Sequence, residues 1–137
     1  MGGAFRASVV RWAAVLILLP SAVRVYVAAE ATNLRQSFEG LQNTVRCVVG
    51  KDPLSGHVFA FINRRRTQVK LLAWTRGGFT IVHKRLERGI FAFDFAAAAS
   101  AHSVEIGADD LAMLLEGVDA STAKRSSRWQ PEALKSG

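Results

Sequence analysis

The stretch that most constrains the fold spans residues 57–95, where short apolar runs alternate with turn residues. Val, Ile, Phe, Trp and Thr dominate these runs, and such residues suit the pleated, half-buried surface of a β-sheet. Paired glycines at Gly77 and Gly78 supply the positive φ angles of a tight hairpin turn. We therefore expect an antiparallel meander, with turns over residues 75–78 and 87–89 and with strands over residues 58–62, 69–74, 79–86 and 90–95.

Segments on either side of this stretch predict two helices. The first covers about residues 33–49, where one apolar stripe recurs at spacings of three and four: Leu34, Phe38, Leu41, Val45 and Val48. The second covers residues 108–119, and its apolar face is Leu111, Leu114, Leu115 and Val118. Residues 103–106 predict a further short strand. The expected fold class is α+β, an antiparallel meander sheet of about four to five strands with two helices packed on it.

A chain of 137 residues fits one domain, which we place at residues 19–120. Residues 1–18 are predicted to be an N-terminal extension, either signal-like or the product of a start site set too early. The signal interpretation follows because Arg6 and Arg11 precede a short apolar run, with a candidate cleavage site at residues 29–31. Against export, residues 23–28 alternate like a strand, and cleavage would remove them. Residues 121–137 predict a polar C-terminal tail.

Charge is the clearest functional signal in the bare residues. Eighteen Lys and Arg stand against eleven Asp and Glu, giving a net charge of +7. Such a balance favours a polyanionic partner, although excess cations also serve solubility. Between residues 64 and 88 only Glu87 is acidic, and eight residues are basic: Arg64, Arg65, Arg66, Lys70, Arg76, Lys84, Arg85 and Arg88.

These eight residues are our candidate nucleic-acid-binding set. Positive side chains neutralise phosphates and release counterions, and arginine grips a phosphate or a guanine edge with two donors. Trp74 and Phe79 lie beside the basic turn, where they would either stack on exposed bases or fill the core. For residues 64–66 the competing interpretation is a solvated loop.

The sequence offers little for catalysis. His57, His83 and His102 are scattered without zinc-type spacing, and no glycine-rich phosphate loop is present. The adjacent pair Asp109 and Asp110 suits a helix start better than a two-metal hydrolase. The single cysteine, Cys47, is predicted to be a buried structural thiol in a reducing, cytoplasmic setting. We expect no catalytic residue, no metal and no cofactor.

Several separated motifs resemble the TnpB accessory proteins of bacterial insertion sequences, in the family numbered sixty-six. The resemblance covers about residues 19–131 in consistent order. It is carried by Thr32 to Leu41 after a short strand, Asp52 to Phe61, Arg64 and Arg65 with Lys70, Lys84 to Gly89 with Phe91, and Leu111 to Asp119.

This resemblance implies a small non-enzymatic protein encoded beside a separate transposase and assisting transposition. DNA is then the expected partner, bound through the basic rim of the sheet. The alternative is a protein-interaction module that docks the transposase or another insertion-sequence protein without touching DNA. Neither hypothesis involves a small-molecule substrate or a membrane.

Overall fold

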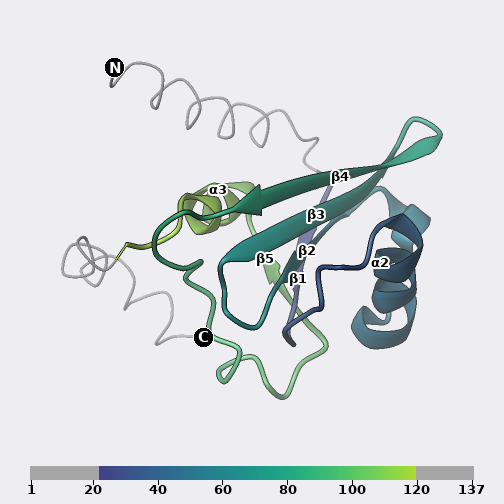
Figure 1. Cartoon of the computed structure of the whole chain (residues 1–137). Coiled ribbons are helices and arrows are strands. Elements are labelled where there is room, and N and C mark those ends of the chain that lie inside the picture. Colours follow the sequence, from purple (N-terminus) through teal and green to yellow (C-terminus); the bar gives the residue numbers. More distant parts are fainter. Residues whose placement is uncertain (1–21, 120–137) are drawn as a thin grey trace, which may run out of the picture.

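Five strands form one mixed sheet in the computed structural model, which describes residues 22–119 (Figure 1). The sheet order is β4-β3-β2-β1-β5. The strands are β1 (Val25–Ala28), β2 (Val58–Ile62), β3 (Gln68–Thr75), β4 (Gly78–Arg85) and β5 (Ser103–Ile106). The helical elements are α2 (Phe38–Thr44), the π-helical turn η1 (Val45–Val49), the 3-10 turn η2 (Pro53–Ser55) and α3 (Ala108–Glu116). The predicted 1–18 extension and 121–137 tail lie outside the described residues.

Strand pairing confirms the predicted α+β class. β2, β3 and β4 form the expected antiparallel meander, and β5 pairs antiparallel with β1. The sequence did not predict that β1 and β2 run parallel, with Val25 opposite Val58. A parallel pair needs a long crossover, and α2 with η1 provides it.

The hairpin between β3 and β4 turns within the predicted residues 75–78, but its positive φ angles fall on Arg76 and Gly77 rather than on the paired glycines, and Gly78 begins β4. Thr75 pairs with Gly78, so that only Arg76 and Gly77 form the loop. Their φ angles are 45° and 82°. Two consecutive positive φ angles characterise the type I′ turn, whose twist matches that of the strands on either side.

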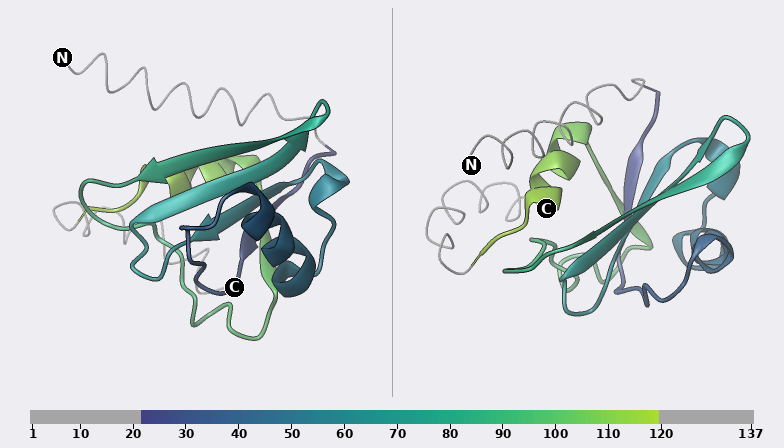
Figure 2. Two further views of the ribbon diagram at one scale, coloured as in Figure 1. Left: turned by 45° about the vertical axis from the view of Figure 1, so that its right-hand side comes forward. Right: turned by 45° about the horizontal axis from the view of Figure 1, so that its top comes forward.

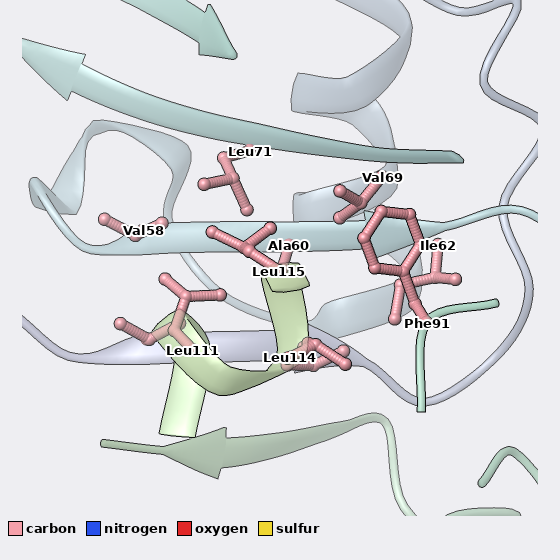
Figure 3. Close-up of a cluster of buried hydrophobic side chains, with 11 residues drawn as sticks. Val58, Ala60, Ile62, Val69, Leu71, Phe91, Leu111, Leu114 and Leu115 are labelled. Atoms are coloured by element: carbon pink, nitrogen blue, oxygen red, sulfur yellow. The ribbon is translucent and has the colours of Figure 1, made fainter. Parts of the chain in front are cut away.

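One face of the sheet packs on α3 (Figure 3). Leu111, Leu114 and Leu115 are buried against the strands, as predicted. The fourth predicted helix residue, Val118, follows the end of the helix and forms an isolated bridge with Ile90. The remaining buried members of this cluster are Val25, Val27, Val58, Ala60, Ile62, Val69, Leu71 and Phe91.

The opposite face packs on α2 and η1, so the sheet lies between the two helical layers (Figure 2). The predicted stripe is only partly right. Leu34, Leu41 and Val45 are buried, whereas Phe38 is 44% exposed and Val48 is 38% exposed. The helix begins at Phe38 rather than Asn33, and its last turn is π-helical. That wider turn shifts the helix phase, so that Val49 is buried in place of Val48.

The prediction that Cys47 is a buried thiol is wrong. Its thiol is exposed rather than buried. Cys47 lies within η1, between Val45 and Val49, the two residues of this turn that pack against the sheet. A thiol at this position therefore contributes nothing to the core.

Residues 90–95 do not form the predicted fourth strand of the meander. Ile90 makes only the single bridge to Val118, and the Phe91 amide donates to the Arg66 carbonyl at 2.7 Å. Phe91 is fully buried in the α3-side cluster. The segment buries its apolar residues by crossing the end of the sheet instead of pairing along it.

Candidate nucleic-acid interface

A cleft opens at the carboxyl end of the parallel pair β1 and β2. The chain leaving β1 is tied there, because the Thr32 amide donates to the Ile62 carbonyl at 2.9 Å. The volume of the cleft is about 510 Å³. It lies between residues 31–35 and the loop joining β2 to β3, and its lining residues are Ala31, Thr32, Asn33, Leu34, Arg35, Asn63, Arg64, Arg65 and Gln68. We call it the arginine cleft.

Three guanidinium groups make this cleft strongly cationic. Arg35, Arg64 and Arg65 line it, all three are exposed, and no lining residue is acidic. Across residues 22–119 the ion pairs are Arg24 with Glu105 and Arg85 with Glu87. The three cleft arginines therefore have no carboxylate partner in the described part of the chain.

The loop that carries Arg64 and Arg65 is held in shape by Asn63. Its side-chain oxygen accepts from the Thr67 amide at 2.8 Å and from the Gln68 amide at 3.0 Å. Its side-chain nitrogen donates to the Thr67 hydroxyl at 3.1 Å. An asparagine that bonds the backbone of its own loop fixes a turn without further packing. The two arginines are thus presented from an ordered loop.

The facing wall is organised in the same way by Asn33. Its side-chain oxygen accepts from the Arg35 amide at 3.0 Å, and the Gln36 side chain donates to the Asn33 carbonyl at 3.1 Å. These local bonds replace the first helical turn that the sequence predicted here. Arg35 consequently lines the cleft together with Arg64 and Arg65 instead of lying within a helix.

Three of the eight predicted binding residues donate hydrogen bonds to backbone carbonyls of the protein. Arg66 donates from its guanidinium to the Phe93 carbonyl at 3.3 Å, and Lys70 donates to the Gln36 carbonyl at 2.7 Å. Lys84 donates to the Leu115 carbonyl near the end of α3. Burial lowers the pKa of Lys84, and the charge of Glu116 opposes that shift. Each of these ammonium or guanidinium groups already has an acceptor inside the protein.

The other five predicted residues lie at two ends of the sheet. Arg85 and Arg88 are exposed near the cleft loop, because the Leu86 amide donates to the Thr67 carbonyl at 2.8 Å. Arg85 pairs with Glu87 at 3.4 Å. Arg76 lies at the far tip of the β3–β4 hairpin. The structure therefore brings Arg64, Arg65, Arg85 and Arg88 to one end of the sheet, separate from Arg76.

Sequence reasoning missed Arg35, which lies within the helix predicted over residues 33–49. The available signal was Asn33, because asparagine bonds local backbone in turns as readily as it caps a helix. It also missed Gln68, whose side chain lines the cleft and bonds the His83 ring at 2.9 Å. Burial, and then the charges of Lys70 and Arg85, lower the pKa of His83.

The aromatic pair beside the hairpin turn favours the core interpretation. Trp74 and Phe79 pack edge to face with ring centroids 4.9 Å apart, and both are half-buried. Phe79 also packs against the α2-side cluster. The pair contributes to the hydrophobic layer on that side of the sheet.

Groups that could support other functions are arranged as follows. Within residues 22–119 no three His, Cys, Asp or Glu residues gather in a way that could hold a metal ion. Asp110 accepts from the Gly107 amide at 3.3 Å, so it caps the start of α3. No helix in that part of the chain is long and apolar enough to cross a membrane.

Comparison with known proteins agrees with the family resemblance found in the sequence motifs. Residues 23–125 match the family model described as IS66 Orf2 like protein. Two uncharacterized proteins of Sinorhizobium fredii are similar over most of their length. The protein y4hO is 32% identical over 83% of this chain and 96% of its own, and y4jC is 26% identical over 80% and 91%. No solved structure matches.

Proposed function

We propose that this chain, which belongs to the family of IS66 Orf2-like proteins, supports transposition as an accessory protein that binds DNA through the arginine cleft. Family membership supports the accessory role, and this family is not known as a family of enzymes. DNA binding is the step that we add. The single observation that carries it is the convergence of Arg35, Arg64 and Arg65 on one cleft without an acidic neighbour.

Phosphate is the part of DNA that such a cleft suits. A guanidinium group presents a planar fork of donors that matches a phosphate, and it keeps its charge at any physiological pH. Arg85 and Arg88 lie at the same end of the sheet and extend the positive surface beside the cleft. Contacts of this kind position a protein on the DNA backbone without reading the base sequence.

The ordered backbone on both walls of the arginine cleft strengthens the proposal. The bonds of Asn63 hold the Arg64–Arg65 side of the cleft, and those of Asn33 hold the Arg35 side. Groups that are already positioned lose less conformational entropy on binding. We therefore expect the cleft to bind phosphates more tightly than an equal number of freely moving surface arginines.

The test compares two double variants with the same change of charge. Arg64→Gln with Arg65→Gln removes two cleft cations, whereas Arg46→Gln with Arg76→Gln removes two exposed cations elsewhere. Fluorescence anisotropy with a short labelled duplex, from low to physiological salt, gives the slope of log affinity against log salt. The cleft variant should reduce that slope by about 2, since each phosphate contact contributes roughly 0.9. Equal slopes for the two variants, or binding insensitive to salt, would refute the proposal.

Docking of a partner protein from the transposition machinery is a second candidate function. The observation that favours it is the apolar exposure of Phe38 and Val48 on α2 and η1. Single exposed apolar side chains are common on protein surfaces, so exposure alone does not identify a docking site. The effect of these two side chains on binding decides the question. A pull-down of the transposase encoded by the same element tests it. Binding should survive nuclease treatment and the cleft variant, and it should weaken when Phe38 and Val48 are both changed to serine. Loss on nuclease treatment would contradict it.

A further inference from the structure

The two edges of the sheet differ in a way that the proposed functions do not use. β5 has only four residues, and its Glu105 is held in an ion pair by Arg24 at 2.8 Å. β4 has eight residues in continuous register with β3, from Gly78 to Arg85. Within residues 22–119 no strand pairs with the outer edge of β4. Soluble proteins usually shorten, bulge or cover such an edge, and β4 is long and regular.

The hairpin fixes which groups point outward from β4. In a two-residue hairpin the residues next to the loop, Thr75 and Gly78, form a hydrogen-bonded pair, and such pairs recur at every second position. The Leu86 amide donates to the Thr67 carbonyl and lies an even number of residues from Gly78, so both residues bond toward the β3 side. The amide and carbonyl groups that face away from β3 therefore belong to the alternate positions: Phe79, Ile81, His83 and Arg85.

Positive charge surrounds this row of outward groups. Arg76 lies at one end of the strand, Arg85 and Arg88 lie at the other, and His83 is exposed between them. Glu87 is the acidic residue nearest in sequence, and it pairs with Arg85. An added strand that carries acidic side chains would meet complementary charge at both of its ends.

We propose that the outer edge of β4 accepts an extended, acidic segment of a partner protein as a sixth strand. Main-chain hydrogen bonds would provide affinity, and the flanking cations would select for acidic side chains. This inference depends neither on the arginine cleft nor on the exposed side chains of α2 and η1.

Charge also argues against two other occupants of this edge. A second copy paired antiparallel about Val82 would bring Arg76 of each copy close to Arg88 of the other, and like charges placed opposite destabilise a strand pair. The chain's own ends are cationic too. Residues 1–21 hold Arg6 and Arg11 with no acidic residue, and residues 120–137 hold four basic residues and Glu132. Nucleic acid would engage the cations but leave the outward backbone groups unused.

The probe is a fluorescein-labelled peptide of alternating glutamate and valine, added to the full chain and followed by anisotropy. The decisive variants are His83→Pro and His83→Ala. Both remove the imidazole, but only proline removes the outward amide, and an edge strand tolerates proline where that amide faces solvent. Circular dichroism verifies that both variants fold. His83→Pro should bind the peptide about tenfold more weakly than His83→Ala, because it loses an edge hydrogen bond and blocks its neighbours.

Two further measurements complete the test. Amide exchange in the free protein should be fast at Phe79, Ile81, His83 and Arg85, and the peptide should slow it. The variant with Arg64→Gln and Arg65→Gln should keep peptide binding, which separates this inference from DNA binding at the cleft. Equal binding by the two His83 variants would overturn the proposal. So would slow exchange in the free protein, which would show that the edge is already occupied.

Discussion

Gly89 offers the sharpest test of how the loop after β4 is packed. Its φ angle is 77°, and a Cβ atom added there would overlap the Val118 carbonyl oxygen and lie 2.7 Å from its carbonyl carbon. Next to it, Ile90 and Val118 exchange two backbone hydrogen bonds of 3.0 and 2.7 Å. Gly89→Ala must therefore both strain φ and push this bridge apart.

The magnitude follows from these two effects. A left-handed conformation costs a residue with a Cβ atom about 1–2 kcal/mol. Losing two backbone hydrogen bonds costs about 0.5–1.5 kcal/mol each. We expect Gly89→Ala to lower the free energy of unfolding by about 3 kcal/mol. Gly77→Ala is the matched control, because Gly77 has a φ of 82° and nothing within 4 Å of an added Cβ atom. It should lose only the conformational part, about 1 kcal/mol.

Urea unfolding followed by circular dichroism measures both variants against the parent chain. The difference between the two alanine variants isolates the close approach of Gly89 to Val118, since their φ angles nearly match. Equal losses of stability would refute the reasoning, because they would mean that residues 118–119 move away from an added methyl group at no cost.

Three further outcomes are expected. Phe91→Ala should lower the free energy of unfolding by about 3–5 kcal/mol, measured by urea unfolding, because the ring is fully buried; a loss below about 1 kcal/mol would contradict its place in the core. Because burial, Lys70 and Arg85 lower the pKa of His83, the folded state resists protonation. Acidification from about pH 7.5 to about pH 5.5 should then destabilise the parent chain more than His83→Gln, and equal urea midpoint shifts would contradict this. Cys47 should react with a maleimide in the folded protein without denaturant, and protection would contradict its exposure.

Patterns confined to a few neighbouring residues predicted the structure well. The apolar run at residues 58–62, the turn within residues 75–78, and the helix face of Leu111, Leu114 and Leu115 are all found where the sequence placed them. Each depends on local turn chemistry or on a side-chain period. Such signals stay valid whatever the rest of the chain does.

Features that depend on distant partners were not predictable. Residues 90–95 carry a strand-like pattern, but Phe91 finds a buried site beside α3 and Arg66 captures its amide. The π-helical turn that buries Val49 in place of Val48 has no composition signal of its own. Both outcomes are decided by packing against elements far away in sequence.

The candidate site was predicted in part for the same reason. Arg64 and Arg65 could be read from the basic loop, but the sequence could not show that Arg66, Lys70 and Lys84 are held by backbone carbonyls. It also could not place Arg35 opposite them, because that depends on the parallel pairing of β1 with β2. That Arg35, Arg64 and Arg65 bind DNA remains a prediction.

The position of β1 between β2 and β5 sets an order on folding. Its neighbours in the sheet, β2 and β5, begin at residues 58 and 103, whereas β2, β3 and β4 are joined by short turns. Closing long loops is slow compared with forming hairpins, so the meander should assemble first and β1 should dock afterwards. On the ribosome, β1 would emerge well before β5, the last described strand that pairs with it. A chain truncated before residue 103 would leave β1 as an open edge, and we expect it to aggregate.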